Sequence, residues 1–253
     1  MERPVKRIAS DVSNIMRDPL ESEGIFYMHD EDDIYTGRAL IVGPPGSLYA
    51  HGFYLFRIIF PADYPVSPPK VVYCTNDGGT RFNPNFYRDG KVCLSVLNTW
   101  KGEGWTSCLT LRAVLTILQS VLTDVPILNE PGITVASADY APYHEIIKYK
   151  NFDYALLALL QEHRLPSEFH IFRKMMVERF LAQYPDILRI VTDNQKGFKR
   201  AYGKNKANIA THLYSMNAVI DYPDLVKKVK AARLQYSRER DSPEPTNTII
   251  ESK

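Results

Sequence analysis

Residues 82–97 read FNPNFYRDGKVCLSVL, which places a single cysteine, Cys93, between a polar, turn-rich loop and an apolar run. The Asn-Pro-Asn triplet at residues 83–85 and the Asp89-Gly90 pair both favour tight turns. A cysteine that only filled the core would more often lie inside a regular apolar segment. We therefore expect the Cys93 thiol at the surface, as a candidate nucleophile that a bulky partner can reach, with a candidate oxyanion donor in the same loop.

The composition is that of a globular chain with room for one ordinary domain and an extension. The 253 residues include 31 basic and 29 acidic side chains, a formal net charge of +2, which calls for neither a nucleic-acid nor a membrane partner. The first residues lack the apolar core of a signal peptide, and no apolar run approaches the roughly 18 residues of a membrane span. We therefore expect the protein to be located in the cytoplasm, the nucleus or both.

Three cysteines are too few and too irregularly spaced for a disulfide framework or a zinc cluster. This favours free thiols in a reducing compartment, and we expect no metal. Cys74 follows a strand-like run, and Cys108 lies where a core helix should begin. We therefore predict that both are small buried side chains and not catalytic thiols.

The first part of the chain predicts helices and an antiparallel meander. Helical spacing of Ile8, Val12, Ile15 and Met16 indicates an amphipathic helix that ends at Asp18-Pro19. Strand-like runs follow at about residues 24–28, 37–42, 53–60 and 70–73. Residues 61–100 contain five prolines and should be mostly ordered loop, where sites are often found.

Helical patterns dominate the rest. A wide apolar face predicts a core helix at about residues 109–123, capped by Thr106 or Ser107, and a further helical segment runs from about residue 141 to residue 160. We predict a first domain over residues 1–165 and a helical extension over residues 166–236, with the spacing of Ile209, Leu213, Met216 and Ile220 also read as helix. Residues 237–253 are polar and are predicted to be a disordered tail.

Several motifs together resemble the ubiquitin-conjugating enzymes. They are, in order, the basic helix with Lys6-Arg7-Ile8, GPPGSLY at residues 43–49, FPADYPVSPPKV at residues 60–71, NPN at residues 83–85, GKVCL at residues 90–94, and Trp105 before the core helix. The resemblance covers about residues 5–163, and the variants around Cys93 and at residues 129–132 are most similar to the Z-type (Use-type) enzymes. It implies an α+β ubiquitin-conjugating fold, an antiparallel meander packed on helices, with a helical C-terminal extension.

The resemblance also implies the chemistry. Cys93 would accept the C-terminal carboxyl group of ubiquitin or a ubiquitin-like protein from an activating enzyme as a thioester, and pass it to a lysine of a protein substrate, usually with a ligase. ATP is used upstream, so no cofactor is expected. A thioester already reacts with amines, so the site needs an accessible thiol and stabilisation of the tetrahedral intermediate. The sequence agrees, because no histidine lies between His51 and His144.

Four further residues are implied as helpers. Asn85 matches the Asn of the family's His-Pro-Asn motif; it could donate to the oxyanion, hold the loop, or only fix a turn. Asn83 replaces that motif's His. Glu130 would aim the lysine amine and Asn129 could orient it, although both could simply face solvent in a turn. Ser95 replaces a common Asp, so it could help only through hydrogen bonding.

Partner surfaces follow from the same resemblance. Lys6 and Arg7 would bind the activating enzyme, and Val66 and Thr106 mark loops that ligases usually touch. In the family, Phe is frequent at the position of Val66, and Ser-Pro-Ala is commoner than Thr106-Ser107-Cys108. These two departures leave open whether the chain binds the usual RING or HECT ligases. In the extension, basic residues interleaved with Phe198 and Tyr202 could bind nucleic acid or an acidic protein, but a solvated face is the expected reading. The basic residues are Lys196, Lys199, Arg200, Lys204 and Lys206.

Three alternatives to a ubiquitin-conjugating transferase stay open. One is a conjugating enzyme for another ubiquitin-like modifier. Another is an inactive, ubiquitin-binding variant, although such variants lack the cysteine. The last is a cysteine hydrolase, which needs the fold to bring a histidine base next to Cys93. The candidate bases are His144, His163, His170 and His212.

Overall fold

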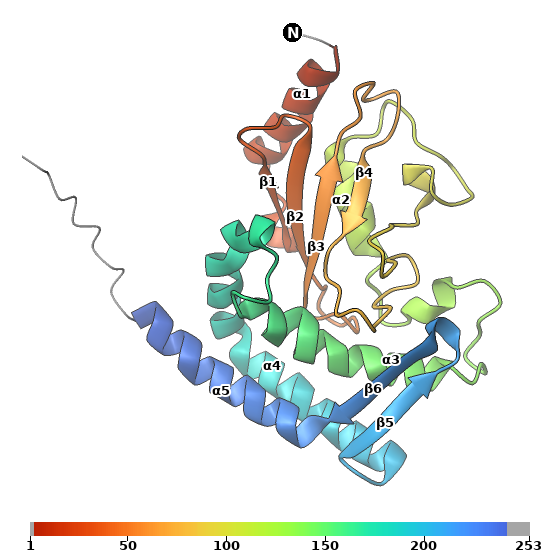
Figure 1. The fold of residues 1–253 in the computed structure, drawn as a ribbon, viewed down its shortest axis with the longest axis vertical. Coiled ribbons are helices and arrows are strands. Elements are labelled where there is room, and N and C mark those ends of the chain that lie inside the picture. The colour runs from red at the N-terminus through yellow and green to blue at the C-terminus, as the bar shows by residue number, and fades with distance from the viewer. Residues whose placement is uncertain (1–2, 242–253) are drawn as a thin grey trace, which may run out of the picture.

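An antiparallel sheet of four strands organises the first part of the chain. The computed structural model describes residues 3–241, and each strand pairs with the next in the order β1-β2-β3-β4. The strands are β1 (Ile25–His29), β2 (Thr36–Val42), β3 (Phe53–Ile59) and β4 (Lys70–Tyr73). The predicted meander is confirmed, with each strand close to its predicted range (Figure 1).

Helix α1 (Arg3–Arg17) contacts helix α2 (Leu111–Ser120) through its apolar face. Ile8, Val12 and Ile15 are buried, as their helical spacing predicts. Met16 was predicted on the same face but is 70% exposed. Successive residues of a helix are about 100° apart, so the neighbour of a buried Ile15 can already lie outside the apolar face.

Helix α2 supplies the core face that its sequence predicts, and the buried side chains are Leu111, Val114, Leu115 and Leu118. The cap differs from the prediction. Thr110, and neither Thr106 nor Ser107, precedes the first helical turn, and its hydroxyl accepts from the Ala113 N–H. The helix therefore begins a little later than the apolar pattern alone indicated.

Helix α3 (Tyr140–Lys150) continues into π-helical turns over Asn151–Ala158, within the range predicted as helical. Asn151 is fully buried at this junction and ties it to the sheet. Its Oδ1 accepts from the Tyr54 hydroxyl at 2.7 Å, and its Nδ2 donates to the Ala50 carbonyl at 2.9 Å. A buried amide with partners on both ends fixes the angle at which this helix leaves the sheet.

The extension packs against this body and shares its core. Helix α4 (Arg173–Tyr202) and helix α5 (Tyr222–Asp241) run side by side below the sheet in Figure 1. Apolar residues of both helices join the buried cluster that contains the strands, and they include Phe180, Ile187, Val191, Leu225 and Val229. The predicted C-terminal helical extension is thus present, and it is packed on the domain that contains the four-stranded sheet.

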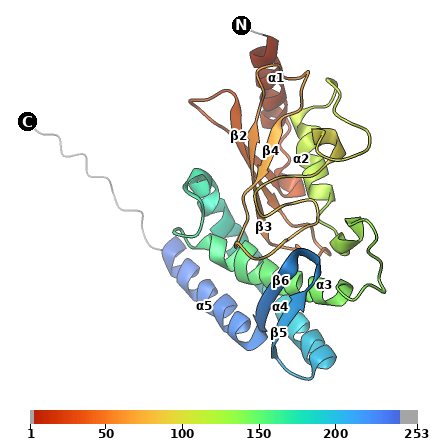
Figure 2. The same ribbon diagram turned by 45° about the vertical axis from the view of Figure 1, so that its right-hand side comes forward.

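One part of the extension was predicted wrongly. Residues read as helix form a hairpin of strands β5 (Lys206–Thr211) and β6 (Met216–Asp221), which lies against α3 in Figure 2. The side chains of β6 alternate between buried and exposed from Met216 to Ile220. Such alternation marks a half-buried strand, and it outweighs the four-residue spacing that indicated a helix.

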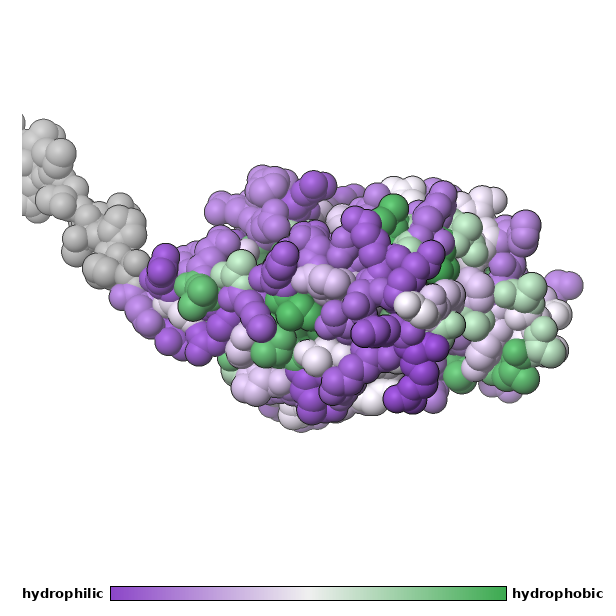
Figure 3. Space-filling model, turned by 90° about the horizontal axis from the view of Figure 1, so that it is seen from below, coloured by the Kyte–Doolittle hydropathy of each residue, from purple (hydrophilic) through white to green (hydrophobic). Residues whose placement is uncertain are grey.

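The carboxyl end of the extension also differs from the prediction. Helix α5 continues to Asp241, so the first residues assigned to a tail at Ser237 are helical; residues 242–253 lie outside the described part of the chain. The molecule seen from below in Figure 3 shows a mostly hydrophilic face, with hydrophobic residues in small separate groups. The apolar side of the extension is therefore directed inward, toward the shared core.

Candidate active site

Cys93 and Asn85 are held together by two reciprocal hydrogen bonds. The Cys93 N–H donates to the Asn85 carbonyl oxygen at 2.8 Å, and Asn85 Nδ2 donates to the Cys93 carbonyl oxygen at 2.8 Å. These bonds close the seven-residue loop, residues 86–92, that lies between them. The sequence prediction that Asn85 lies at Cys93 matches this geometry, and its side chain performs the loop-holding role directly.

Asn83 anchors the same loop to the core. Its Oδ1 accepts from the Asn85 N–H at 2.8 Å, and its Nδ2 donates to the Tyr49 hydroxyl at 3.0 Å and the Val121 carbonyl at 2.8 Å. Asn83 is completely buried, so each of these polar contacts replaces a lost contact with water. An asparagine at this position thus fixes the loop from both ends of its amide.

Cys93 is less accessible than its sequence predicts. The residue is only 4% exposed, and its thiol donates to the Thr99 carbonyl oxygen at 3.0 Å. The expectation of a thiol at the open surface is wrong because the chain makes a short 3-10 turn over Ser95–Leu97 and folds back beside Cys93. Thr99 secures this return: its hydroxyl accepts from the Leu94 N–H at 2.9 Å and donates to the Val92 carbonyl at 2.8 Å.

Ser95 occupies the start of that turn and is half-buried. Within residues 3–241 its hydroxyl has no hydrogen-bond partner, so it is free to donate or accept. No contact in the structure tests the predicted role of Ser95 in orienting a lysine, which stays a prediction.

Asn129 and Glu130 lie on the opposite side of Asn85 but differ in their surroundings. Asn129 is exposed, and its Nδ2 donates to Asn85 Oδ1 at 3.3 Å. Glu130 is half-buried, and its Oε2 accepts a short hydrogen bond from the Tyr214 hydroxyl of the extension. The structure thus joins Asn129 to the Cys93 loop and ties Glu130 to a residue 84 positions further along the chain.

Two further residues of this region received no predicted role from the sequence, although one of them, Arg81, lies in the stretch that resembles the Z-type enzymes. Arg81 is buried, donates to the carbonyl oxygens of Asn83 at 3.1 Å and Pro84 at 2.7 Å, and stacks 3.3 Å from the centre of the Tyr87 ring. Tyr214 lies on its other side, with the guanidinium 4.9 Å from its ring centre. The position of Arg81, two residues before Asn83, is the only local signal; Tyr214 has none.

No histidine is placed as a base for Cys93 in the described residues. His144 is buried, and its Nδ1 contacts the Tyr140 carbonyl at 2.8 Å; burial lowers its pKa, with the Tyr140 contact opposing that shift. The ring of His170 contacts the Leu165 carbonyl at 3.0 Å, while His163 and His212 are exposed. The arrangement that a cysteine hydrolase requires is therefore not assembled.

The other two thiols are placed differently from each other. Cys74 is half-buried, and burial raises its pKa to about 11. Cys108 is exposed, contrary to the prediction, because helix α2 begins only at Leu111 and leaves Cys108 in the preceding loop. Neither thiol has a partner resembling Asn85.

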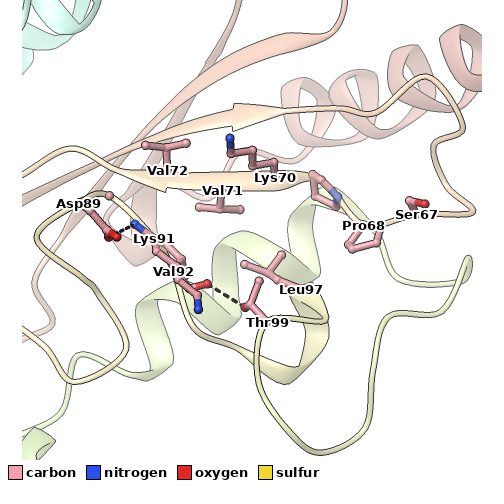
Figure 4. A pocket seen from close by; sticks show the side chains of 12 residues that line it. Ser67, Pro68, Lys70, Val71, Val72, Asp89, Lys91, Val92, Leu97 and Thr99 are labelled. Atoms are coloured by element: carbon pink, nitrogen blue, oxygen red, sulfur yellow. Dashed lines mark hydrogen bonds between the residues drawn. The ribbon is translucent and has the colours of Figure 1, made fainter.

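A groove of about 550 Å³ runs beside the site (Figure 4). Strand β4 forms one wall, and residues 89–92 with Leu97 and Thr99 form the other. The dashed line between Thr99 and Val92 in Figure 4 is the contact that holds the return of the chain next to Cys93. In the described part of the chain, no cluster of three metal-ligating side chains is found, and no helix could cross a membrane.

Comparison with known proteins identifies the family. Residues 7–149 match the family described as Ubiquitin-conjugating enzyme. The chain belongs to the ubiquitin-conjugating enzyme family. The matched range contains Cys93, Asn85, Asn129 and Glu130, so the whole candidate site except Tyr214 lies inside the family domain.

The predicted likeness to Z-type conjugating enzymes is confirmed. The chain is 41% identical to Ubiquitin-conjugating enzyme E2 Z of Xenopus tropicalis over 160 residues, which covers 62% of this chain and 50% of that protein. It is 38% identical to the Homo sapiens protein of that name over 181 residues, covering 70% and 50%. The chain therefore spans about half the length of the curated relatives it matches.

A solved structure of human Ubiquitin-conjugating enzyme E2 G1 aligns with 29% identity over 47% of this chain and 94% of that one, with a TM-score of 0.42. At that TM-score the alignment adds nothing to the family assignment.

Lys6 and Arg7, the two residues predicted to bind an activating enzyme, differ in their surroundings. Arg7 is not a free cation: it donates to Asp11, to the Ser107 carbonyl at 2.7 Å and to the Leu109 carbonyl at 2.6 Å, while Lys6 is exposed. Arg7 thus joins α1 to the loop before α2. The Arg7 guanidinium is used in these intramolecular hydrogen bonds, so Lys6 is the more available of the two predicted contacts.

Val66 and Thr106 belong to one surface of this family member. Val66 is 67% exposed and Thr106 is exposed as well. Trp105 connects their loops, since its indole N–H donates to the Pro65 carbonyl at 2.8 Å and its ring contacts Tyr64. Trp105 therefore fixes the position of the Val66 loop relative to the Thr106 loop, the two loops predicted to contact a ligase.

In the basic stretch of the extension, residues 196–206, some of the cations are already paired with carboxylates. Lys196 pairs with Asp193 at 3.0 Å, and Lys206 pairs with Asp221 at 2.8 Å. Phe198 is buried and stacks on Tyr202, so it is not offered to a nucleic-acid base. These contacts favour the solvated-face interpretation of this stretch.

Proposed function

We propose that this chain is a ubiquitin-conjugating transferase. Cys93 accepts the C-terminal carboxyl group of ubiquitin from an activating enzyme as a thioester, and the acyl group then passes to a lysine amine of a protein substrate, usually with a ligase. The observation that carries the proposal is the reciprocal bonding of Cys93 and Asn85 inside the matched family domain. ATP is used upstream, so the chain needs no cofactor of its own.

The transfer step needs a donor for the oxyanion. The lysine nitrogen attacks the thioester carbon, the carbon–sulfur bond breaks, and Cys93 leaves as a thiolate, while the amine loses a proton. Negative charge builds on the carbonyl oxygen in between, where an amide N–H stabilises it. Asn85 Nδ2 carries two hydrogens and gives one to the Cys93 carbonyl, so the second remains to donate to an oxyanion.

The lysine amine needs to be oriented and deprotonated. Asn129 is bonded to Asn85 and so to the Cys93 loop, and the carboxylate of Glu130 follows it in the chain. We assign Glu130 the role of aiming the amine and accepting its proton, with Asn129 and Ser95 as possible further contacts.

Partners follow from the exposed positions. Lys6, with Arg7 shaping the helix beneath it, would meet the activating enzyme, and the surface of Val66 and Thr106 would meet a ligase. Because that surface carries neither the frequent Phe nor Ser-Pro-Ala, we expect a restricted set of ligases. As part of this proposal we place the protein in the cytoplasm, the nucleus or both.

A charging assay tests the function. The protein is incubated with activating enzyme, ATP and a panel of ubiquitin and ubiquitin-like proteins, and the products are run on a non-reducing gel. We expect an adduct that a thiol reagent removes, that Cys93→Ala abolishes, and that the matched exposed-thiol control Cys108→Ala retains. The modifier that charges decides between ubiquitin and another ubiquitin-like protein. Absence of an adduct with every modifier would contradict the proposal.

A further inference from the structure

The tip of the β5-β6 hairpin, residues 212–215, bridges the two loops that flank Cys93. Toward one loop, Arg88 donates to the Tyr214 carbonyl oxygen. Toward the other, the Tyr214 hydroxyl donates to Glu130. An element of the extension thus contacts both sides of the candidate active site, which a separate appended domain would not do.

Asp139 fixes the tip from below. It stands just before helix α3, where a side chain often caps the helix, yet its carboxylate makes no such bond. Instead, its two oxygens accept from the N–H groups of His212 at 2.9 Å and Leu213 at 2.7 Å. Hydrogen bonds to an ionised carboxylate are among the stronger ones in proteins, so the tip is firmly seated.

The backbone of the tip is bent in an uncommon way. Tyr214 has a φ of 62° and Ser215 a φ of 48°, which residues other than glycine seldom adopt. Such conformations persist where the surroundings determine them, and they concentrate at functional sites. Here the bend delivers the Tyr214 side chain to its contacts with Glu130 and Arg81.

Tyr214 is suited to hold a carboxylate. Its hydroxyl is half-buried and bonded to Oε2 of Glu130, while its ring lies between the Arg81 guanidinium and Tyr143. Burial and the neighbouring carboxylate raise its pKa, so it stays a hydrogen-bond donor over the working pH range. The Oε1 oxygen of Glu130 takes no part in this bond and can receive a lysine amine.

We propose that Tyr214 is a positioning residue that fixes the Glu130 carboxylate for the incoming lysine, so that the extension completes the transfer site. This inference rests on the proposed function. A glutamate side chain has several rotatable bonds, and it loses conformational entropy when it is held in one orientation. A carboxylate that is already oriented accepts the amine proton faster, because this entropy is not lost again during the reaction. The Tyr214 contact supplies that order without touching Cys93.

The test is a double-mutant cycle on discharge to free lysine. Charged protein is isolated, and loss of the thioester is followed against lysine concentration for the wild type, Tyr214→Phe, Glu130→Gln and the double variant. We expect normal charging throughout, discharge of Tyr214→Phe slowed by about three- to tenfold, and no further slowing when Tyr214→Phe is added to Glu130→Gln. Asp139→Asn, which weakens the seating of the tip, should slow discharge to a smaller extent.

Tyr27→Phe is the matched control, because it also removes a hydrogen bond of a half-buried hydroxyl, between Tyr27 and His29 Nδ1 at 2.7 Å, on strand β1 at the sheet edge opposite β4. Its discharge should equal that of the wild type, and thermal melting should show all variants folded. Unchanged discharge in Tyr214→Phe, or the same slowing in the presence and absence of Glu130, would overturn the inference while leaving the proposed function intact. A wild-type protein that never charges would overturn both.

Discussion

Asn85 and Cys93 exchange a pair of hydrogen bonds, one from the Cys93 N–H to the Asn85 carbonyl and one from the Asn85 side chain to the Cys93 carbonyl. The side chain that is proposed to stabilise the oxyanion therefore also defines the backbone on which the thiol sits. Loop-holding and catalysis are then two consequences of one amide, because its first hydrogen holds the loop and its second remains to donate to an oxyanion.

Replacing Asn85 by Ala should affect transfer more than charging. The variant loses the bond to the Cys93 carbonyl and the contact with Asn129, so discharge to free lysine should slow by about tenfold or more. Thermodynamic stability should fall by about 1 kcal/mol. Single-turnover discharge and urea unfolding measure the two effects, with the exposed Asn208→Ala as control; normal discharge would remove Asn85 from the catalytic residues.

Replacing Arg81 by Lys should destabilise the Cys93 loop although the charge is kept. A lysine cannot bond to the Asn83 and Pro84 carbonyls in one plane or stack on Tyr87 as the guanidinium does. We expect a loss of about 2–3 kcal/mol in unfolding free energy. The exposed Arg17→Lys should change it little. An Arg81→Lys protein as stable as the wild type would show that these contacts are dispensable.

Cys74 and Cys108 should differ in alkylation. At pH 8 iodoacetamide should modify the exposed Cys108 well before Cys74, because a pKa of about 11 leaves about one Cys74 thiol in a thousand ionised at that pH. The rate at Cys74 should rise about tenfold per pH unit up to that pKa. Peptide mapping by mass spectrometry gives the order, and equal rates at Cys74 and Cys108 would refute it.

Stability should fall as the pH drops below about 6.5. Burial lowers the pKa of both His29 and His144, so the unfolded chain binds protons at a pH where the folded protein does not. The stability from the neutral histidines is therefore present above the ordinary pKa and is lost as the pH falls toward their folded values. Urea unfolding at pH 7.5 and 5.5 should show a smaller loss in His144→Gln than in the wild type or the exposed-residue control His212→Gln. An unchanged loss in His144→Gln would be inconsistent with this account.

The predictions that held depend on short-range signals. The turn residues around Cys93, the short strand-like runs of the four sheet strands and the apolar face of α2 all act within a few positions. The placing of Asn85 at Cys93 was predicted from the resemblance of both motifs to the family, and no local rule of turn or period supplies it. The hairpin was missed because Ile209, Leu213, Met216 and Ile220 satisfy a helical spacing. The alternation of burial along β6 appears only in the structure, since the exposed position 219 also carries an apolar residue, Val219.

Burial of individual thiols was not predictable in the same way. The exposure of Cys93 depends on how Thr99 returns to it, and that of Cys108 on where helix α2 actually begins. Both are outcomes of packing among loops, for which residue type and spacing give no rule.

The sequence by itself indicated the family and, through that resemblance, the placing of Asn85 at Cys93. It also determined the meander sheet, because turn chemistry and periodicity act between near neighbours. Only the tertiary structure decided that Cys93 is covered, that Arg81 braces its loop, and that Tyr214 reaches Glu130 from a hairpin of the extension. That last contact joins residues 84 positions apart, and its existence depends on a core shared by both parts of the chain.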